Sequence, residues 1–489
     1  MNANRENNGL IRLVIPFHIQ KDFVPEKNWN KEHIAKASAN QIRKYKPEND
    51  LYEYIIDLMN DDNKTGINND IASSYFYSNQ KYYQKRKYTL EMNEEEYHFN
   101  VVTVGAVVFT TNVVILWYEL EFKGKISSEE KIEIIDALKE FNYTKKSKLI
   151  CCIEDVPFTD SINIEELKEN KQVKVIKEKD ITIEGVDTTL ITYSKEIKPF
   201  GIIEDILAEF DVDSFFVKRR HKTKDNCNKE ILPDRAIPFS YVCDIEKNDD
   251  IMSRKNMAWH LGRGYKSTYL MSNQISDDDF MVPFEDSLWY ACLEGCSNYC
   301  TPHEENSFLG KPDYYKVRIN SYFYLYVLCL GQYYSLLQFA QEVSALPTTV
   351  KGYENGKYNL EEMCERIRVF NLKNNFSQVG HLTQHNDFYK YLQKRLGVNE
   401  LQNELQVELQ EIYEVIKHKQ DKKKERRYRV LSIIAGIYAV LQAFVNVAAM
   451  YESATTGNKE YFIFASTGCV LMAIMGVVIW LVWSKFSND

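Results

Sequence analysis

Several features that would indicate a particular class of protein are missing from this 489-residue sequence. The N-terminus, residues 1–8, is polar and lacks the basic and then apolar order of a signal peptide, so we expect most of the chain to stay in the cytosol. Ten cysteines are too few for a disulfide framework and are consistent with reduced thiols. No nucleophile elbow, Walker loop or His-Glu-x-x-His pair occurs. We therefore expect a protein that is not an enzyme.

Acidic residues outnumber basic ones in most of the chain. The last 73 residues carry 10 Lys or Arg against 5 Asp or Glu, which leaves 51 against 65, a net charge of −14, in residues 1–416. Because neutralising phosphates requires a basic face, this acidity argues against direct binding of nucleic acid. Residues 1–416 are long enough for two or three structural units of roughly 100–200 residues each.

Two uncharged runs near the C-terminus are long enough to cross a membrane. Residues 430–450 span about 30 Å as a helix. Residues 461–483 form the second run, with Trp480 and Trp483 at the level of an interfacial aromatic belt. Residues 451–460 between them contain a Gly-Asn turn signal and predict a short outer loop. The sequence therefore predicts a transmembrane hairpin.

The positive-inside rule sets the orientation of this hairpin. A basic cluster precedes the first run, and Lys485 follows the second within the tail 484–489, so both termini are expected in the cytosol. The cluster is explained by topology and contact with anionic lipids, and a further role in gating is the alternative. Its members are Lys417, Lys419, Lys422, Lys423, Lys424, Arg426, Arg427 and Arg429.

The cytosolic portion begins with an α/β pattern, which we place at residues 1–250. Apolar or alternating runs predict strands at residues 10–15, 97–103, 106–109 and 113–122, with a hairpin turn at 110–112. Ser127 opens a capping signature and a helix to residue 140. Residues 218–228 are basic and then polar, and predict a solvated loop.

Residues 251–397 have the character of a helical region. Helices are expected over 313–346 and 360–376. The uncharged run 321–340 is long enough to span a membrane, but its tyrosines, glutamines and serines favour a soluble core helix that protein neighbours satisfy.

A stalk helix with a basic collar is predicted for residues 398–429. Neither Pro nor Gly interrupts the chain from Glu400 to Gly436, so the helix is expected to run unbroken into the first span. Its apolar seam, which Asn399 can cap, predicts parallel association with copies of the same chain. The seam consists of Val398, Leu401, Leu405, Leu409, Ile412 and Ile416.

Small and polar residues share one face of the first span. Amides inside a bilayer usually face a bundle interior or water, and small neighbours leave room for a lumen. We interpret this face as pore-lining, and hydrogen bonding within a purely structural bundle is the alternative. The residues are Ser432, Gly436, Ala439, Gln442 and Asn446, at spacings of four, three, three and four.

A candidate ligand site lies between residues 254 and 266. Its glycines let the backbone approach a ligand, its basic side chains can meet phosphate, and its aromatic side chains can stack on adenine. An ordinary basic turn is the alternative. The candidate residues are Arg254, Trp259, Arg263, Tyr265 and Lys266.

Three cysteines recur every four residues, and His303 follows them. We expect no metal site, because this spacing is also that of an apolar stripe of small side chains on a helix. The cysteines are Cys292, Cys296 and Cys300.

The order of these elements resembles the CorA family of divalent-cation channels, which join an α/β cytosolic domain to a long stalk helix and two C-terminal spans. Family members carry Tyr-Gly-Met-Asn at the outer end of the first span, where asparagines from five subunits meet a hydrated ion. Here Met450 matches, and so joins the candidate pore-lining residues, whereas Tyr451 stands at the asparagine's place. That departure weakens the expectation of magnesium selectivity.

In size and layout the chain is similar to divergent CorA-like effectors of type III CRISPR systems. The resemblance implies a homopentameric channel in the bacterial inner membrane, gated by a messenger made from S-adenosylmethionine and ATP (SAM-AMP) in antiviral defence. A magnesium transporter of the ordinary CorA type is the alternative. A third possibility, a membrane-tethered binding module without a pore, predicts that Gln442 and Asn446 tolerate apolar replacement.

Overall fold

The structure is a computed structural model, and it describes residues 9–20, 29–31, 51–52, 55, 72–77, 85–141, 147–157, 173–183, 186–216, 234–244, 250–272, 275–303, 307–311, 314, 318–346, 360–374 and 376–456. The chain divides into two units. The first comprises Met1–Pro347 and Glu361–Val407, and the second comprises Thr348–Leu360 and Glu408–Asp489. The predicted loop 218–228 and the predicted second span 461–483 lie outside the described residues.

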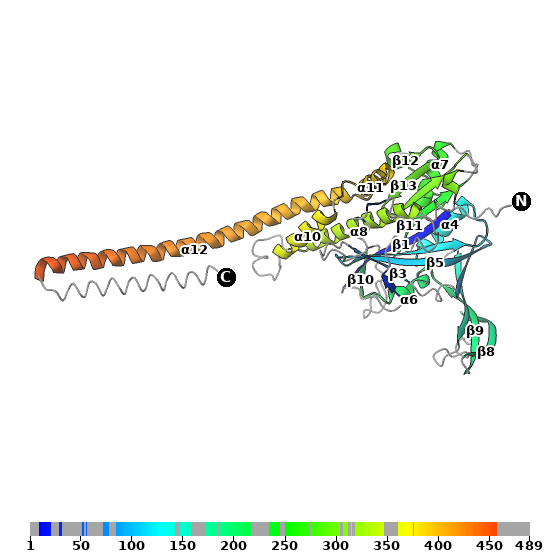
Figure 1. The fold of residues 1–489 in the computed structure, drawn as a ribbon, viewed down its shortest axis with the longest axis horizontal. Coiled ribbons are helices and arrows are strands. Elements are labelled where there is room, and N and C mark those ends of the chain that lie inside the picture. Colours follow the sequence, from blue (N-terminus) through cyan, green and yellow to red (C-terminus); the bar gives the residue numbers. More distant parts are fainter. Residues whose placement is uncertain are drawn as a thin grey trace. The chain divides into compact units, whose positions relative to one another are not determined.

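A large mixed sheet forms the centre of the first unit (Figure 1). Among the described strands, only β11 and β14 pair in parallel. Three further strands lie off the main path: β10 (Val212–Phe215) pairs with β1, β3 (Ala72–Tyr77) with β5, and β2 (Trp29–Lys31) with β3. The order across the sheet is β12 (Phe280–Phe284), β13 (Ser287–Cys292), β14 (Gly295–Cys300), β11 (Ile237–Cys243), β1 (Gly9–Ile19), β6 (Val113–Phe122), β5 (Glu95–Phe109), β4 (Arg86–Met92), β7 (Ser147–Pro157), β9 (Val186–Ile197) and β8 (Val173–Ile183).

The central hairpin shows how local sequence sets this sheet. Asn112 adopts a positive φ of 62° in the turn between β5 and β6, a conformation that asparagine tolerates better than most residues. The two strands predicted at 97–103 and 106–109 are one strand, because Gly105 between them leaves room for the Trp117 ring. A Cβ at position 105 would lie 2.3 Å from Trp117 Cζ2.

Helices cover the sheet. The described helices of the first unit that lie near it are α4 (Ser128–Lys139), α6 (Glu204–Leu207), α7 (Ile251–Arg263), α8 (Ile319–Ser344) and α11 (Thr383–Leu396), with the short turns η2 (Pro199–Ile202), η3 (Asp277–Asp279) and η4 (Phe308–Gly310). The Ser127 capping box of α4 is confirmed: Ser127 Oγ accepts from the Glu130 amide at 3.1 Å, and Glu130 Oε2 accepts from the Ser127 amide at 2.6 Å.

Helix α8 packs on the sheet and is buried over most of its length. The Phe323 ring lies 5.3 Å from Trp117 on β6 and 5.0 Å from Phe239 on β11. At Gly331 the helix touches the Phe109 ring so closely that a Cβ would lie 1.9 Å from Phe109 Cζ. The prediction that residues 321–340 form a protein core helix is therefore confirmed.

The prediction that residues 251–397 form a helical region is only partly right. Strands β12, β13 and β14 lie in this region and extend the sheet beside β11. The helical stripe proposed for the cysteines is wrong, because Cys292 ends β13 while Cys296 and Cys300 lie on β14. A spacing of four places side chains on one face of a strand as well as of a helix, so the pattern could not distinguish the two.

Two further helices complete the C-terminal region. Helix α10 runs over Leu360–Asn374, close to its predicted range. Helix α12 runs over Val398–Thr456 and continues from the first unit into the second. Of the predicted seam, Val398, Leu405 and Ile412 are buried. Within α12, Lys424–Val445 is long and apolar enough to cross a membrane; it begins six residues before the predicted span and overlaps most of it.

Candidate functional site

The structure gathers part of the predicted ligand site at the C-terminal end of α7. The Arg263 guanidinium lies 5.4 Å from the Trp259 ring and 5.9 Å from the Tyr265 ring, and the two rings meet edge to face at 5.7 Å. Gly264 caps the helix in the left-handed region, with φ 59°, where glycine is favoured. The cation and the two aromatic rings expected from the sequence therefore do lie together.

The polar groups of this cluster already form ion pairs and hydrogen bonds with other residues of the chain. Glu294, in the turn between β13 and β14, lies 3.1 Å from Arg263 and 3.2 Å from Arg235, and accepts a hydrogen bond from Tyr265 Oη at 2.7 Å. Arg263 Nε also donates to Tyr290 Oη at 2.9 Å. A phosphate at Arg263 would have to displace the Glu294 carboxylate, which makes the cluster a poor vacant site.

The other members of the predicted site lie apart from this cluster or have partners. Lys266 pairs with Asp136 at 3.6 Å. Arg254 is buried, with 8% of its surface exposed, and donates to the carbonyl oxygen of Glu285 at 2.6 Å. Gly262 serves packing rather than ligand approach, because a Cβ there would lie 2.7 Å from Tyr290 Cδ1.

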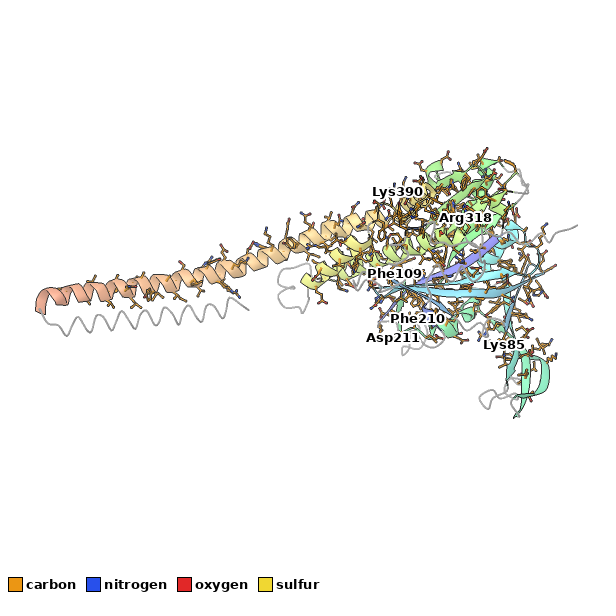
Figure 2. The ribbon with its side chains drawn as sticks, in the orientation of Figure 1. Lys85, Phe109, Phe210, Asp211, Arg318 and Lys390 are labelled. Atoms are coloured by element: carbon orange, nitrogen blue, oxygen red, sulfur yellow. The ribbon has the colours of Figure 1, made fainter. Side chains whose placement is uncertain are left out.

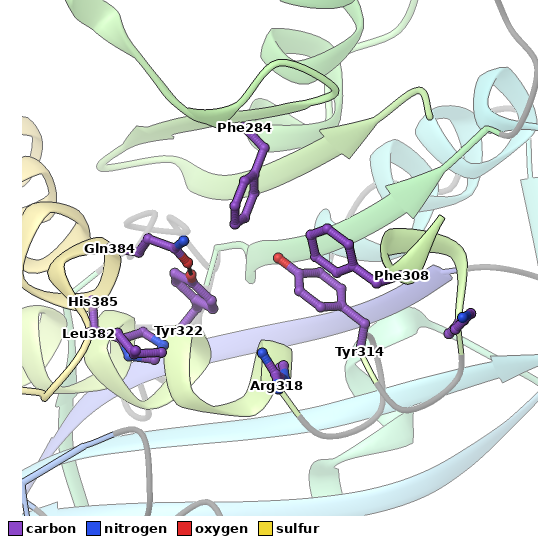
Figure 3. Close-up of a pocket in the computed structure, with 9 residues that line it drawn as sticks. Phe284, Phe308, Tyr314, Arg318, Tyr322, Leu382, Gln384 and His385 are labelled. Atoms are coloured by element: carbon purple, nitrogen blue, oxygen red, sulfur yellow. Dashed lines mark hydrogen bonds between the residues drawn. The ribbon is translucent and has the colours of Figure 1, made fainter. Parts of the chain in front are cut away.

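A hollow lined by aromatic and basic side chains lies elsewhere in the first unit, and sequence reasoning missed it. Figure 3 shows Phe284, Tyr314 and Tyr322 around the hollow, with Arg318 at its edge. Its volume is about 520 Å³, within the range of small-molecule sites. We call it the aromatic pocket, and its lining residues are Phe284, Phe308, Lys311, Tyr314, Arg318, Tyr322, Leu382, Gln384 and His385.

Four elements build the aromatic pocket, and their rings pack against one another. Phe284, at the end of β12, meets Phe308 of η4 edge to face at 5.4 Å, and Phe308 meets Tyr314 in the same way at 5.3 Å. On the helical side, Tyr322 of α8 lies 4.7 Å from the His385 ring of α11. Tyr322 Oη also donates to Gln384 Oε1 at 3.3 Å. The walls are thus preformed.

The electrostatics of the aromatic pocket favour an anion. Its lining includes two cationic side chains, Lys311 and Arg318, both exposed, and no carboxylate is among the nine described lining residues. Burial raises the pKa of Tyr314 well above its ordinary value, so its hydroxyl stays neutral at physiological pH. This arrangement can hold a flat ring between aromatic side chains and an anionic group at the rim.

A buried hydrogen-bonded group fixes the start of α8 to the sheet. Arg12 of β1 is 6% exposed and donates from Nε and Nη2 to Glu119 Oε2 of β6, at 2.9 and 2.8 Å. Arg12 Nη2 also donates to Asn320 Oδ1 of α8 at 2.6 Å, two residues after Arg318. The rim arginine of the pocket therefore begins a helix that is fixed to the sheet.

The predicted pore-lining positions fall on α12. Ser432, Gly436, Ala439 and Gln442 are exposed, and no atom lies within 4 Å of a Cβ built at Gly436. The side chains of Asn446 and Met450 lie outside the described part of the helix, although both residues belong to it. The helix brings the stripe onto one face, as its spacing predicts.

The cysteines show no sign of reactive or ligating chemistry. Burial raises the pKa of Cys300 to about 12 and that of Cys296 well above its ordinary value, so both remain thiols. Among the described residues, no group of three or more His, Cys, Asp or Glu side chains is placed to hold a metal ion.

No family model, curated protein or solved structure matches the chain. The resemblance to CorA-like channels therefore stays a prediction from the order of the elements.

Proposed function

We propose that the chain is a homo-oligomeric, two-span membrane channel of the CorA-like type, with both termini in the cytosol of a bacterial cell. We further propose that a nucleotide messenger of the SAM-AMP type opens it as an antiviral effector. The observation that supports the channel is the division of α12 into two faces between residues 430 and 450.

One face of this segment is apolar and exposed. At about 100° per residue, the large exposed apolar side chains fall within an arc of about 120°. Such a surface is unfavourable in water and suits the acyl chains of a bilayer. Its members are Val430 (53% exposed), Ile433, Ile437, Val440, Leu441, Phe444 (70% exposed) and Val447.

The other face carries the stripe of small and polar residues, within a separate arc of about 120°. A helix with lipid on one side needs a bundle interior or water on the other to satisfy its amides. Copies of α12 arranged around an axis would place these amides at the lumen, where their oxygens replace part of an ion's water shell. The basic cluster just before residue 430 then lies at the cytosolic membrane surface and contacts anionic lipids.

The test is ion flux in liposomes that contain the full chain. Replacing Gln442 or Asn446 with leucine should reduce flux, because it removes polar lumen groups. Val440→Leu, on the apolar arc, is the matched control and should leave flux unchanged. If all three variants conduct ions as the unmodified chain does, the pore assignment is refuted and a tethered binding module is favoured.

Two further measurements define the channel. Flux measured separately with K⁺ and Mg²⁺ distinguishes a weakly selective pore from a magnesium transporter, which would pass Mg²⁺ preferentially. The mass of the detergent-solubilised protein should correspond to an oligomer, with five subunits expected. A monodisperse monomer would contradict the proposal.

A further inference from the structure

We propose that the aromatic pocket is a binding site for a nucleotide and that α11 transmits its occupancy to α12. The binding step stands on the pocket alone, whereas the effect on α12 rests on the proposed channel function. The chemistry that selects this ligand class is a preformed aromatic cleft with two cations at its rim.

The base would lie among the aromatic rings. Phe284 and Phe308 form one wall and Tyr322 with His385 forms another, and purine rings stack on such faces. Gln384 accepts from Tyr322 Oη at Oε1, and its Nε2 group with the second lone pair of Oε1 can meet the N7 and N6 edge of adenine.

The phosphate would lie at the rim. Lys311 and Arg318 both line the pocket and are exposed, so their charges can reach an anion without prior burial. Arg318 suits a phosphate because its planar guanidinium can donate two parallel hydrogen bonds. A ring flanked by an anion is the common feature of nucleotides, and the pocket holds groups for both parts.

The opposite end of α11 connects directly to α12. Leu382, Gln384 and His385 at the start of α11 line the pocket, and Gly397 ends the helix in the left-handed region with φ 72°. Val398 then begins α12. A ligand that fixes the first turn of α11 therefore acts on a helix that is one residue from the proposed channel helix.

The packing of α11 makes it a rigid element along its length. Gln332 Nε2 of α8 donates to Tyr389 Oη at 2.9 Å, and the Ala291 amide of β13 donates to Tyr391 Oη at 2.9 Å. Near its C-terminal end, Arg395 forms an ion pair with Asp279 of η3. A shift of α11 would therefore move the helix as one body and change these contacts with α8, β13 and η3.

Binding is tested on the detergent-solubilised full chain by calorimetric titration with AMP, adenosine and inorganic phosphate. AMP should bind more tightly than either fragment, because only AMP uses both the rings and the cations. Arg318→Ala should weaken AMP binding about tenfold and leave adenosine binding unchanged. Phe308→Ala, at a ring that is 46% exposed, should weaken both AMP and adenosine.

Two controls bracket this experiment. Lys390→Ala removes an exposed cation of α11 that does not line the pocket and should leave AMP affinity unchanged (Figure 2 labels Lys390 and Arg318). Arg263→Ala tests the cluster at the end of α7 and should also leave it unchanged. The proposal is overturned if AMP shows no saturable binding, or if Arg318→Ala binds AMP as the unmodified chain does.

Flux separates this proposal from the channel itself. If AMP binds through Arg318 but neither the unmodified chain nor any variant conducts ions, the nucleotide site is supported and the channel function is refuted. If the chain conducts ions but AMP does not bind, the channel function is supported and the nucleotide site is refuted.

Discussion

Replacing Arg12 with methionine should loosen α8 from the sheet. Arg12 is the shared partner of Glu119 on β6 and Asn320 on α8, and its guanidinium also lies 4.4 Å from the Phe323 ring. Methionine fills similar volume but removes every hydrogen bond and the charge. Glu119, with 20% of its side chain exposed, then keeps a largely buried negative charge without its partner.

The free energy of unfolding should fall by about 3 kcal/mol. Breaking a buried ion pair costs about 3–5 kcal/mol, and the lower value applies because water can still reach part of Glu119. The double variant Arg12→Met with Glu119→Leu removes both charges. It should recover most of the loss, since an apolar pair of similar size is often as stable as the ion pair.

Urea unfolding of the full chain in mild detergent, followed by tryptophan fluorescence, measures this change. Trp117 reports on the interface because its ring lies 5.3 Å from Phe323. A loss below about 1 kcal/mol for Arg12→Met would refute the reasoning, since it would be no more than a surface pair contributes. A double variant no more stable than Arg12→Met would refute it as well.

Three further predictions concern single positions. Gly331→Ala should lower stability by about 1–3 kcal/mol in thermal unfolding, because its Cβ would overlap the Phe109 ring. Gly397→Ala should cost about 1 kcal/mol at φ 72°, whereas Gly397→Asn should cost less, since asparagine tolerates that region. Burial lowers the pKa of His260 below its ordinary 6.5, so its contribution to stability is full above pH 6.5 and is lost as pH falls from there toward the folded-state value. Unfolding free energies measured from pH 7.5 to 5.5 should therefore decline more steeply in the unmodified chain than in His260→Gln.

The elements predicted correctly from the sequence are those whose start, end or face is set by residues close together in the chain. Strand β6 has its predicted bounds because an apolar run is closed on one side by the Asn112 turn. Helix α4 follows from the capping box at Ser127, which is complete within four residues. The stripe on α12 was likewise predictable, because residues on one unbroken helix need only their spacing to share a face.

The aromatic pocket had no such local signal. Its lining residues come from β12, from η4 and the residues after it, from α8 and from the start of α11, and only the sheet and the packing of α8 on it bring them together. Helix α11 was itself missed, because Leu382 at its N-cap makes no side-chain capping bond and offers no start signal. The cluster at Arg263 was predicted as a group, but its partner Glu294 comes from the turn between β13 and β14.

On the proposed mechanism, the pocket explains how a modest ligand could shift a channel. Moving a population from about 1% to 99% open requires a difference of about 5.5 kcal/mol in ligand binding between the two states. Shared among five subunits this is about 1.1 kcal/mol each, less than one charge-assisted hydrogen bond contributes. Arg318 begins α8, which Arg12 fixes to the sheet, and Gln384 and His385 belong to α11, which leads into α12. A nucleotide that touches both walls is therefore sensitive to their spacing, and that sensitivity is the difference in affinity that gating requires.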